Sequence, residues 1–342
     1  MKIALDVMGG DNAPQSNILG AKHFIESIDD PEVKVILCGP ESIIKEEMAK
    51  LGLQNIENNI EICNAGDIVE MNEEKPAYAF KNKPNSSLVR AVQLVKNNKA
   101  DAVISAGNTA ALLSSSLFIL GKIEGIKRPA LATHIPNKKN GFILCDVGAN
   151  TDVKPAHLIQ FAIMSSDYVK YIQKIDSPKV ALLNIGSERN KGNKLTTETY
   201  PLMEKNIENF IGNIETRDLL NGDADVVICD GFTGNSVLKM LEGLISYFYK
   251  TLNSNTKIQN SDEITDTVDA IFNKFNYEEH GASPFLGVKG IVLKCHGSCS
   301  EISIKNACHS AKDFCDSKII NKMEEDLNSK KKNFNSLELA NK

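Results

Sequence analysis

The chain has 342 residues, of which 42% are hydrophobic and 24% are charged, and its formal net charge is −5. These values are typical of a soluble globular protein, and the length suffices for one large or two ordinary domains with a substantial core. The negative charge argues against a nucleic-acid-binding protein. The longest apolar stretch, 110–120, contains three serines and is too short to span a bilayer.

Eight cysteines occur in the chain. Cys38, Cys145 and Cys229 lie inside apolar runs, where cysteine behaves as a small hydrophobic residue. The N-terminal residues pass directly into a predicted strand, with no secretion signal before it. We therefore expect reduced cysteines and a cytoplasmic protein.

Short apolar runs, typical of buried parallel strands, alternate along the chain with segments of helical spacing. The predicted strands are 2–8, 33–38, 60–63, 102–105, 130–134, 142–146, 180–185, 226–229 and 291–295. One predicted helix begins after Pro14, and the others are 42–51, 86–97, 108–120, 155–172, 193–210, 236–252, 263–275 and 301–314. This alternation predicts an α/β fold with a mainly parallel sheet.

The domain organisation follows from the same pattern. We expect residues 1–327 to form a single α/β catalytic domain, with a helical pair at about 236–276 that makes an excursion from it. The loop between the two helices, 253–261, is polar and rich in asparagine. The last residues, 328–342, are rich in lysine, asparagine and serine, and we expect them to form a frayed tail.

Three familiar site motifs do not occur in the sequence. There is no Gly-x-Gly dinucleotide fingerprint, no phosphate-binding P-loop motif and no Gly-x-Ser-x-Gly elbow of a serine esterase. Instead, polar loops with glycine follow strands or open helices, at 9–11, 105–109, 146–150, 184–192, 230–235 and 296–298. Such loops can offer N–H donors to a phosphate or an oxyanion, although glycine, asparagine and aspartate also serve simply to make turns.

The segment 223–238 shows this pattern most completely. The apolar run 226–229 predicts a strand, 230–235 predicts a tight loop with two glycines, and the spacing from Ser236 onward predicts a helix. Backbone N–H groups at such a helix start point at one spot and form an anion site. Strand ends converge on one crevice in this fold class, so we expect the loops to build a common site.

Two basic residues and one histidine are candidates for chemistry. Lys191 lies in a glycine-bounded loop, where it can hold a phosphate as a point charge or remain a solvated lysine, and Arg189 can act in the same way. His296 follows a predicted strand, where it can exchange a proton during acyl transfer or cap the neighbouring Ser298.

Three further patterns leave alternatives open. Cys295, His296, Cys299, Cys308 and His309 suggest a zinc site, but their spacing departs from Cys-x-x-Cys. Cys295 beside His296 could also be a nucleophile, although its strand favours ordinary packing. The locally basic segment 75–90 is either a solvated surface or a surface that attracts an acidic protein partner.

A set of motifs occurs in a fixed order. They are 3–14, 105–109, 146–150, 184–186, 191–192, 230–235, 286–290 and 296–298. Together they resemble the bacterial phosphate acyltransferase family, whose members depend on acyl carrier protein, over about residues 1–315. The chain departs from the family pattern in three ways. Ala110 replaces a preferred Gly, and Ser187 replaces a preferred Glu. The segment 280–284 replaces a preferred Gly-Gly-Ala-Pro, and Cys299 replaces a preferred second Ser.

The resemblance implies a three-layer α/β/α fold with a mainly parallel sheet, similar to phosphate acetyltransferases and isocitrate dehydrogenases. It implies that a fatty acyl thioester on acyl carrier protein reacts with inorganic phosphate to give acyl phosphate. A membrane acyltransferase then uses this product to acylate glycerol 3-phosphate in phospholipid synthesis. The resemblance also implies a homodimer that works without a metal or an organic cofactor; that nucleic acid is not a partner is expected from the net charge alone.

The chemistry suggests roles for the loop residues. Phosphate is already a nucleophile, so an enzyme has to place it in line with the thioester carbonyl and stabilise the oxyanion. We expect Lys191 and the N–H groups of 231–235 to bind phosphate, and His296 to handle the proton of the leaving thiol. Asp230 is expected to orient its loop, and Asn235 completes the predicted catalytic set.

The remaining predicted site residues bind substrate. Asn108 and Thr109 are expected to bind the phosphate or the oxyanion, and Asp146 is expected to orient a loop. The full substrate-binding set is Gly9, Gly10, Asp11, Ser105, Gly107, Asn108, Thr109, Asp146, Asn150, Asn184, Gly231, Thr233 and Gly234.

Other functions are compatible with the sequence. They are a phosphate acetyl- or butyryltransferase that uses coenzyme A, an NAD-dependent decarboxylating dehydrogenase, and a non-catalytic scaffold for lipid-synthesis proteins. The helical pair favours dimer packing, with weak contact of its polar tip to the membrane or to the membrane acyltransferase.

Overall fold

The computed structural model describes residues 1–53, 58–254 and 281–328, together with the single positions 269, 272 and 275. Its contacts divide the chain into two compact units. The first unit consists of Met1–Pro129 and His280–Lys332, and the second of Ala130–Glu279 and Asn333–Lys342. The expectation of a single catalytic domain over 1–327 stays a prediction, because two contact units can belong to one domain.

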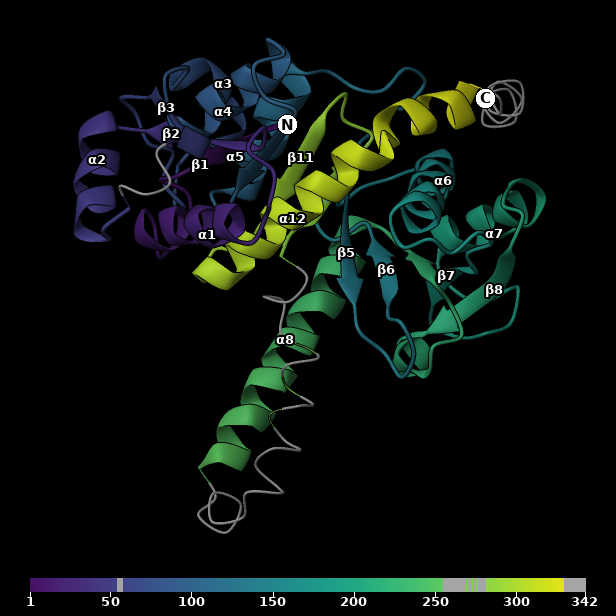
Figure 1. Cartoon of the computed structure of the whole chain (residues 1–342). Helices are drawn as coiled ribbons and strands as arrows, with labels where there is room; N and C mark the ends of the chain where they lie inside the picture. Colours follow the sequence, from purple (N-terminus) through teal and green to yellow (C-terminus); the bar gives the residue numbers. More distant parts are fainter. Residues whose placement is uncertain (54–57, 255–268, 270–271, 273–274, 276–280, 329–342) are drawn as a thin grey trace. The chain divides into compact units, whose positions relative to one another are not determined.

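The first unit contains a mainly parallel sheet with the strand order β3-β2-β1-β4-β11-β10 (Figure 1). Only β10 runs antiparallel to its neighbour β11. The central strands are buried along nearly their whole length, which explains their continuous apolar runs. The strand bounds are β1 Lys2–Asp6, β2 Lys34–Gly39, β3 Ile60–Asn64, β4 Ala102–Ser105, β10 Ser283–Leu286 and β11 Ile291–Lys294.

Helices connect and cover these strands. α1 packs against α12, and α4 packs against α5, while α12 and α4 both contact β4. The helix bounds are α1 Gln15–Glu26, α2 Glu41–Lys50, η2 Pro76–Tyr78, α3 Ala79–Asn82, α4 Ser87–Lys96, α5 Thr109–Ile119 and α12 Glu301–Ser317.

Within the second unit the strands are mainly parallel and follow the order β5-β6-β9-β7-β8 (Figure 1). Here β5 is antiparallel to β6, and all other neighbours are parallel. The strand bounds are β5 Ala130–Ile135, β6 Phe142–Cys145, β7 Val180–Asn184, β8 Phe210–Glu215 and β9 Val226–Ile228, and the helix bounds are α6 Pro155–Tyr171, α7 Lys194–Asn206, η3 Thr216–Asn221 and α8 Gly231–Asn253. Parallel strands alternate with helices in both units, which confirms the predicted α/β class.

The structure differs from the prediction in three segments. No strand was predicted after the helix 193–210, yet β8 begins at Phe210; it is a half-exposed strand with Gly212 at φ 99°, so its strand pattern is weak. β10 lies in a segment predicted as a Gly/Pro loop, because Pro284 and the four-residue length conceal it. α8 begins at Gly231 instead of Ser236, because Asp230 caps it.

Two other predictions fall outside what can be compared. Most of the predicted helix 263–275 and of the loop 253–261 lies outside the described residues, as does the tail beyond 328. Among the helices that the structure describes, none is long and apolar enough to cross a membrane.

A glycine contact between α1 and α12 yields a stability prediction. A Cβ built on Gly20 would collide with Cβ of Ile304 and would lie 2.7 Å from the carbonyl oxygen of Glu301. Overpacking of this kind costs about 1–3 kcal/mol, which outweighs the helix propensity of about 1 kcal/mol that alanine gains over glycine. We therefore expect Gly20→Ala to lower the free energy of unfolding in urea denaturation.

The matched control is Gly243→Ala, which changes an exposed glycine of α8 that has no atom within 4 Å of its added Cβ. Helix propensity alone should make this variant equally stable or more stable. A Gly20→Ala variant as stable as the Gly243→Ala variant would contradict the close packing of α1 against α12.

Candidate functional site

Three loops of the first unit leave the same edge of its sheet. Asp6 at the end of β1 is in register with Ser105 at the end of β4, and Ser105 is in register with Lys294 at the end of β11. Since these strands are parallel, the loops that follow them begin side by side. The structure thus brings together the predicted residues of 9–11, 105–109 and 296–298.

Glycines allow these loops to touch. A Cβ on Gly9 would lie 2.6 Å from both the Asp6 carboxylate and the backbone nitrogen of Gly107. Gly10 has φ 101°, and a Cβ there would lie 3.0 Å from the carbonyl oxygen of Gly297. The N–H of Asp11 donates to that same carbonyl at 2.7 Å. Close approach of backbone to backbone therefore explains why glycine occupies these positions.

Asp6 is a buried carboxylate that holds the loop after β4 in place through a hydrogen bond. It is 1% exposed, and its Oδ2 accepts a hydrogen bond from Ser105 Oγ at 2.6 Å. Ser105 Oγ in turn accepts from the N–H of Gly107 at 3.0 Å. Burial raises the pKa of Asp6, and hydrogen bonds from Ser105 and Ser87 counteract this shift. Ser105 and Gly107 thus shape the loop through Asp6, a residue that the sequence analysis did not single out.

Lys294 is the second functional candidate that the sequence analysis missed. It is 8% exposed, and its Nζ donates to the carbonyl oxygens of Ala106, at 3.3 Å, and of Cys295. Its positive charge lowers the pKa of Asp6. Its position could have been noticed in the sequence, because Lys294 is the last residue of an otherwise apolar strand and lies two residues before His296. This buried ammonium ties the loops after β4 and β11 together.

His296 is partly buried, and its ring is oriented by the next turn. Its Nδ1 lies 2.9 Å from Ser298 Oγ and accepts from the N–H of Ser298 at 3.3 Å. Since Nδ1 accepts a backbone proton, the neutral ring carries its own proton on Nε2. This tautomer can donate a hydrogen bond from Nε2. Asn12 holds the same turn through the carbonyls of Ser298 and Cys299.

Asn108 has structural partners at both ends of its amide. Its Oδ1 caps α5 by accepting from the N–H of Ala111 at 3.1 Å, and its Nδ2 donates to the carbonyl of Met71 at 2.9 Å. Thr109 is the first residue of α5 and is partly exposed. Asn108 therefore fixes the helix start, and Thr109 presents a hydroxyl there; substrate binding by either residue stays a prediction.

The loop that follows β6 in the second unit folds around Asp146. This residue is 0% exposed, and each carboxylate oxygen accepts two hydrogen bonds. Oδ1 accepts from the N–H groups of Leu131 and Ala149, and Oδ2 accepts from the N–H and the side-chain amide of Asn150. Burial raises the pKa of Asp146, and these hydrogen bonds oppose the shift. The predicted role of Asp146 in orienting a loop agrees with this geometry.

The N-terminus of α8 packs on that same loop. Asp230 caps the helix by accepting from the N–H and the hydroxyl of Thr233, at 2.9 and 2.7 Å. The N–H of Gly231 donates to the carbonyl of Asn150 at 2.7 Å, and that of Gly234 donates to the carbonyl of Asp230. These three N–H groups therefore have partners within the protein.

Consequently, their predicted binding of phosphate would require these contacts to be exchanged, and it stays a prediction. Gly231 and Gly234 also serve packing, because a Cβ on Gly234 would collide with the carbonyl oxygen of Asp146. Asn235 is exposed, close to Gly148, from which an added Cβ would lie 3.6 Å from its side chain.

The loop after β7 holds the predicted cation. Asn184 Nδ2 donates to the carbonyl of Lys191 at 3.0 Å, and Asn184 Oδ1 accepts from the N–H of Ile185. The side chain of Lys191 is 50% exposed, and its Nζ lies 4.0 Å from Glu188. Arg189 instead pairs with Glu204 at 2.8 Å and lies over the ring of Tyr200. The geometry therefore favours Lys191 over Arg189 as an anion ligand.

Two alternatives from the sequence find no support at this site. Burial raises the pKa of the Cys295 thiol well above its ordinary value, which disfavours the thiolate that a nucleophile needs. Within the described ranges, no three histidine, cysteine, aspartate or glutamate side chains gather as a metal ion would require.

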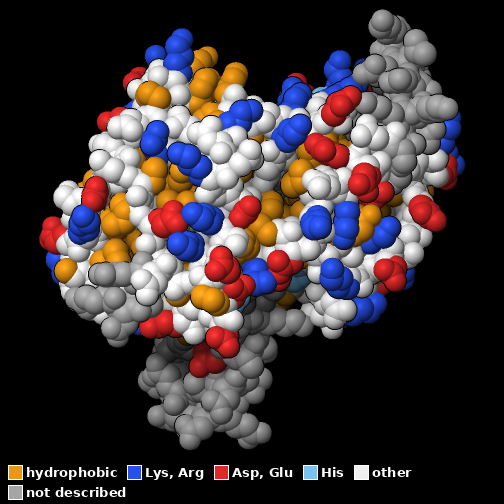
Figure 2. Space-filling view, turned by 45° about the horizontal axis from the view of Figure 1, so that its top comes forward, with side chains coloured by type: hydrophobic (Ala, Val, Ile, Leu, Met, Phe, Trp, Pro, Cys, Tyr) orange, Lys and Arg blue, Asp and Glu red, His pale blue; other side chains and the backbone are white. Residues whose placement is uncertain are grey.

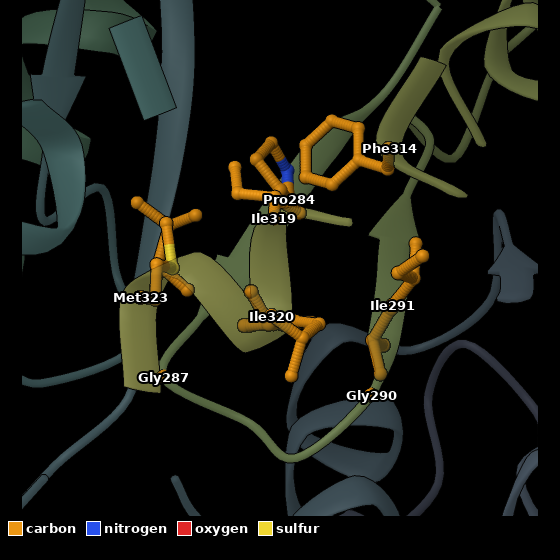
Figure 3. A pocket seen from close by; sticks show the side chains of 11 residues that line it. Pro284, Gly287, Gly290, Ile291, Phe314, Ile319, Ile320 and Met323 are labelled. Carbon is orange, nitrogen blue, oxygen red and sulfur yellow. The ribbon is translucent and has the colours of Figure 1, made fainter. Parts of the chain in front are cut away.

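An apolar hollow in the first unit lies at the opposite end of β11 from His296 (Figure 3). Its lining includes Gly290 and Ile291 of the strand start and Phe314 of α12. It has space for roughly one water molecule, so it cannot hold a fatty acyl chain as it stands.

The charged side chains are mixed on the surface in view. Figure 2 shows lysine and arginine side chains interspersed with aspartate and glutamate, without one large basic patch on that face. That nucleic acid is not a partner stays a prediction.

Comparisons with known proteins agree with these observations. Residues 1–322 match the family model described as "Fatty acid synthesis protein". A phosphate acyltransferase of Clostridium perfringens (strain SM101 / Type A) is 42% identical over 337 residues, which cover 96% of this chain and 98% of that protein. One from Clostridium acetobutylicum is 41% identical over 340 residues, with 96% and 99% coverage.

Solved structures resemble the chain in fold. A phosphotransacetylase from Streptococcus pyogenes has a TM-score of 0.62 at 18% identity and covers 94% of each chain. A phosphotransacetylase from Staphylococcus aureus has a TM-score of 0.61 at 18% identity, with 92% and 94% coverage. These matches confirm the predicted three-layer α/β/α fold of the phosphotransacetylase type.

The buried lysine yields a prediction on stability. Lys294→Met removes the donor of two buried carbonyls, which costs about 1–3 kcal/mol. It also removes a positive charge near Asp6, so the pKa of Asp6 rises further. Protonation of Asp6 then relieves part of the cost, and we expect the loss of stability in urea denaturation to be larger at pH 7 than at pH 5.

Lys289→Met is the matched control, because Lys289 is exposed in the turn before the same strand. It should change stability little at either pH. Equal losses for the two variants, or a Lys294→Met loss that grows on acidification, would contradict the assigned contacts.

Proposed function

We propose, from the premise that this chain belongs to the family described as "Fatty acid synthesis protein" and is an acyltransferase, that it transfers a fatty acyl group from acyl carrier protein to inorganic phosphate. The product is an acyl phosphate, which a membrane enzyme uses to acylate glycerol 3-phosphate. The observation that carries the proposal is the similarity to phosphate acyltransferases over 96% of the chain, with the loop motifs at the strand ends of both units.

The mechanism requires few catalytic groups. Phosphate attacks the thioester carbonyl directly, a tetrahedral oxyanion forms, and the thiolate of the carrier leaves. We assign the phosphate to Lys191, whose half-exposed ammonium can turn toward an anion. We assign the leaving thiolate to His296, whose neutral ring can donate a hydrogen bond from Nε2 to the sulfur, while the hydrogen phosphate nucleophile supplies the proton that the thiol takes up.

The other residues hold the site in shape. Asp230 and Asp146 fix the two loops at the start of α8, and Asp6 and Lys294 fix those of the first unit. Preorganised loops do not have to rearrange when charge develops in the transition state. Such preorganisation accounts for much of the rate enhancement at sites of this kind. No covalent acyl-enzyme is needed in this scheme.

The donor is proposed to be acyl carrier protein, an acidic protein. In the basic segment 75–90, Lys75 and Lys81 are exposed, whereas Lys83 pairs with Glu73 at 2.6 Å. Lys75 and Lys81 therefore have side chains directed to solvent, as electrostatic attraction of an acidic partner requires.

A second candidate function uses coenzyme A as the thiol carrier. The fold similarity to phosphotransacetylases favours it. The two functions are separated by measuring kcat/KM for the long-chain acyl thioester of acyl carrier protein and for acetyl-, butyryl- and long-chain acyl-coenzyme A at equal concentrations. A higher kcat/KM for the coenzyme A thioesters would contradict our proposal, and failure to form any acyl phosphate would favour the scaffold alternative.

Two further proposals concern the oligomeric state of the protein and its location in the cell. α8 exposes large hydrophobic side chains along its length, which an isolated soluble helix rarely does. They are Phe232, Met240, Leu244, Tyr247, Phe248 and Tyr249. We propose that these side chains pack in a homodimer, and that the cytoplasmic protein makes only weak contact with the membrane.

Lys191→Ala tests the phosphate assignment. Loss of a charge-assisted hydrogen bond of about 1.5–3 kcal/mol should raise the KM for phosphate by roughly 10- to 100-fold, with a smaller change in the KM for the acyl donor. Lys194→Ala is the control, because Lys194 is 88% exposed and lies three residues along the chain. An unchanged KM for phosphate in Lys191→Ala would contradict the assignment.

Met240→Glu tests the dimer. A charge on an exposed apolar face should convert a dimer to monomers in analytical ultracentrifugation, whereas Lys239→Glu on the neighbouring position should not.

Liposome flotation measures the membrane contact, which we expect to be weak and lost at high salt. Strong binding that survives high salt would contradict the dimer as the main role of this face.

A further inference from the structure

Two cysteines of the first unit lie side by side, away from the residues with assigned roles. Cys38 of β2 is paired in register with Cys63 of β3. Residues in register on parallel strands project to the same face of the sheet. Adjacent strands lie about 4.8 Å apart, within the Cα separation of about 4.4–6.8 Å that a disulfide spans.

The two thiols differ in their surroundings. Cys38 is 0% exposed, while Cys63 is half-buried on the edge strand. The Cys38 thiol donates to the carbonyl oxygen of Ile36 at 3.7 Å and also interacts with Cys63, while Arg90 and Lys99 place positive charge near Cys63. The interaction with Cys38, opposed in part by burial and then aided by Arg90, lowers the pKa of Cys63 to about 6. This shift favours the thiolate form of Cys63 at neutral pH.

The other cysteines contrast with Cys63. Burial raises the pKa of Cys145, Cys229 and Cys295 above the ordinary value, and raises that of Cys315 to about 12. Reactive sensor thiols combine a low pKa, access to solvent and a neighbouring resolving cysteine. Cys63 with Cys38 has all three properties.

We propose that Cys63 and Cys38 form a peroxide-sensitive dithiol, with Cys63 as the attacking thiolate and Cys38 as the resolving thiol. The Cys63 sulfur attacks the O–O bond of hydrogen peroxide, forms an S–O bond and releases hydroxide, which takes up a proton to become water. Cys38 then loses its proton and attacks the Cys63 sulfur, forming the disulfide as the S–O bond breaks and a second water leaves. Two thiols are oxidised and one peroxide is reduced.

Peptide mapping of the full chain tests this proposal. After treatment with a small excess of hydrogen peroxide and alkylation of remaining thiols, trypsin should yield peptide 35–45 joined to peptide 51–81, because Pro76 blocks cleavage after Lys75. The joined pair should weigh about 2 Da less than the two reduced peptides, and dithiothreitol should separate them. Peptides with Cys38 and Cys63 still fully alkylated, under conditions that oxidise other cysteines, would overturn the proposal.

Single variants assign the two roles. Cys38→Ser should stop at a sulfenic acid on Cys63 that dimedone traps, and Cys63→Ser should prevent oxidation of Cys38. Cys315→Ser, at a partly exposed cysteine of high pKa, should leave the cross-link unchanged. A cross-link to Cys38 in the Cys63→Ser variant would overturn the assignment.

A measurement on the unmodified chain does not depend on the folding of any variant. Iodoacetamide at pH 7 should label Cys63 at least tenfold faster than Cys315. Equal labelling rates would overturn the proposal that Cys63 is the attacking thiolate.

Discussion

A buried carboxylate at the end of a strand organises the loops in each unit. Removal of a carboxylate from water is costly unless several donors replace the water. Asp146 obtains its donors from the loop that it begins and from the neighbouring strand β5, and Asp6 obtains them from Ser105 and Ser87. Because the donors Ser105, Ala149 and Asn150 belong to the site loops, the need to satisfy the carboxylates helps to fix the shape of those loops.

The polar residues of the loops fall into two groups, those that hold the backbone and those whose side chains remain accessible. Several residues that resemble ligands in the sequence are occupied in holding the backbone: Asn108 and Asp230 cap helices, and Asn184 closes its own loop. Lys191 lies on the loops of the second unit and His296 on those of the first, and neither side chain is fully buried. Rigid loops that present a few exposed groups suit a reaction in which both reactants carry their own reactivity, as phosphate and a thioester do.

Much of the fold could be predicted from the sequence, because buried parallel strands and the helices between them have distinct periods. β8 and β10 could not, since an edge strand that is half exposed and a short strand with proline lack that period. The start of α8 was misplaced for a different reason: glycines at 231 and 234 resemble a loop, and only the contact with Asp146 shows why a helix needs them.

The site was predictable in its loops but not in its supports. Asp6 and Lys294 each stand at the end of an apolar run, where they are easily counted as strand termini. Their importance depends on register, because Asp6, Ser105 and Lys294 are distant in sequence and become neighbours only when three strands pair. The same holds for Cys38 and Cys63, whose pairing depends on β2 and β3. Side-chain partners across a parallel sheet are set by the topology, which single-sequence patterns do not contain.

The division of the first unit into two chain segments affects how the protein is made. β11 pairs with β4, and α12 packs against α1, yet about half of the chain lies between β4 and β11 in sequence, and about four fifths of it lies between α1 and α12. During synthesis, β4 therefore keeps one unpaired edge until β11 has left the ribosome, whereas strands β5 to β9 of the second unit emerge earlier and in uninterrupted order. The nascent chain thus carries an open strand edge through most of its translation, the kind of surface that chaperones protect from aggregation.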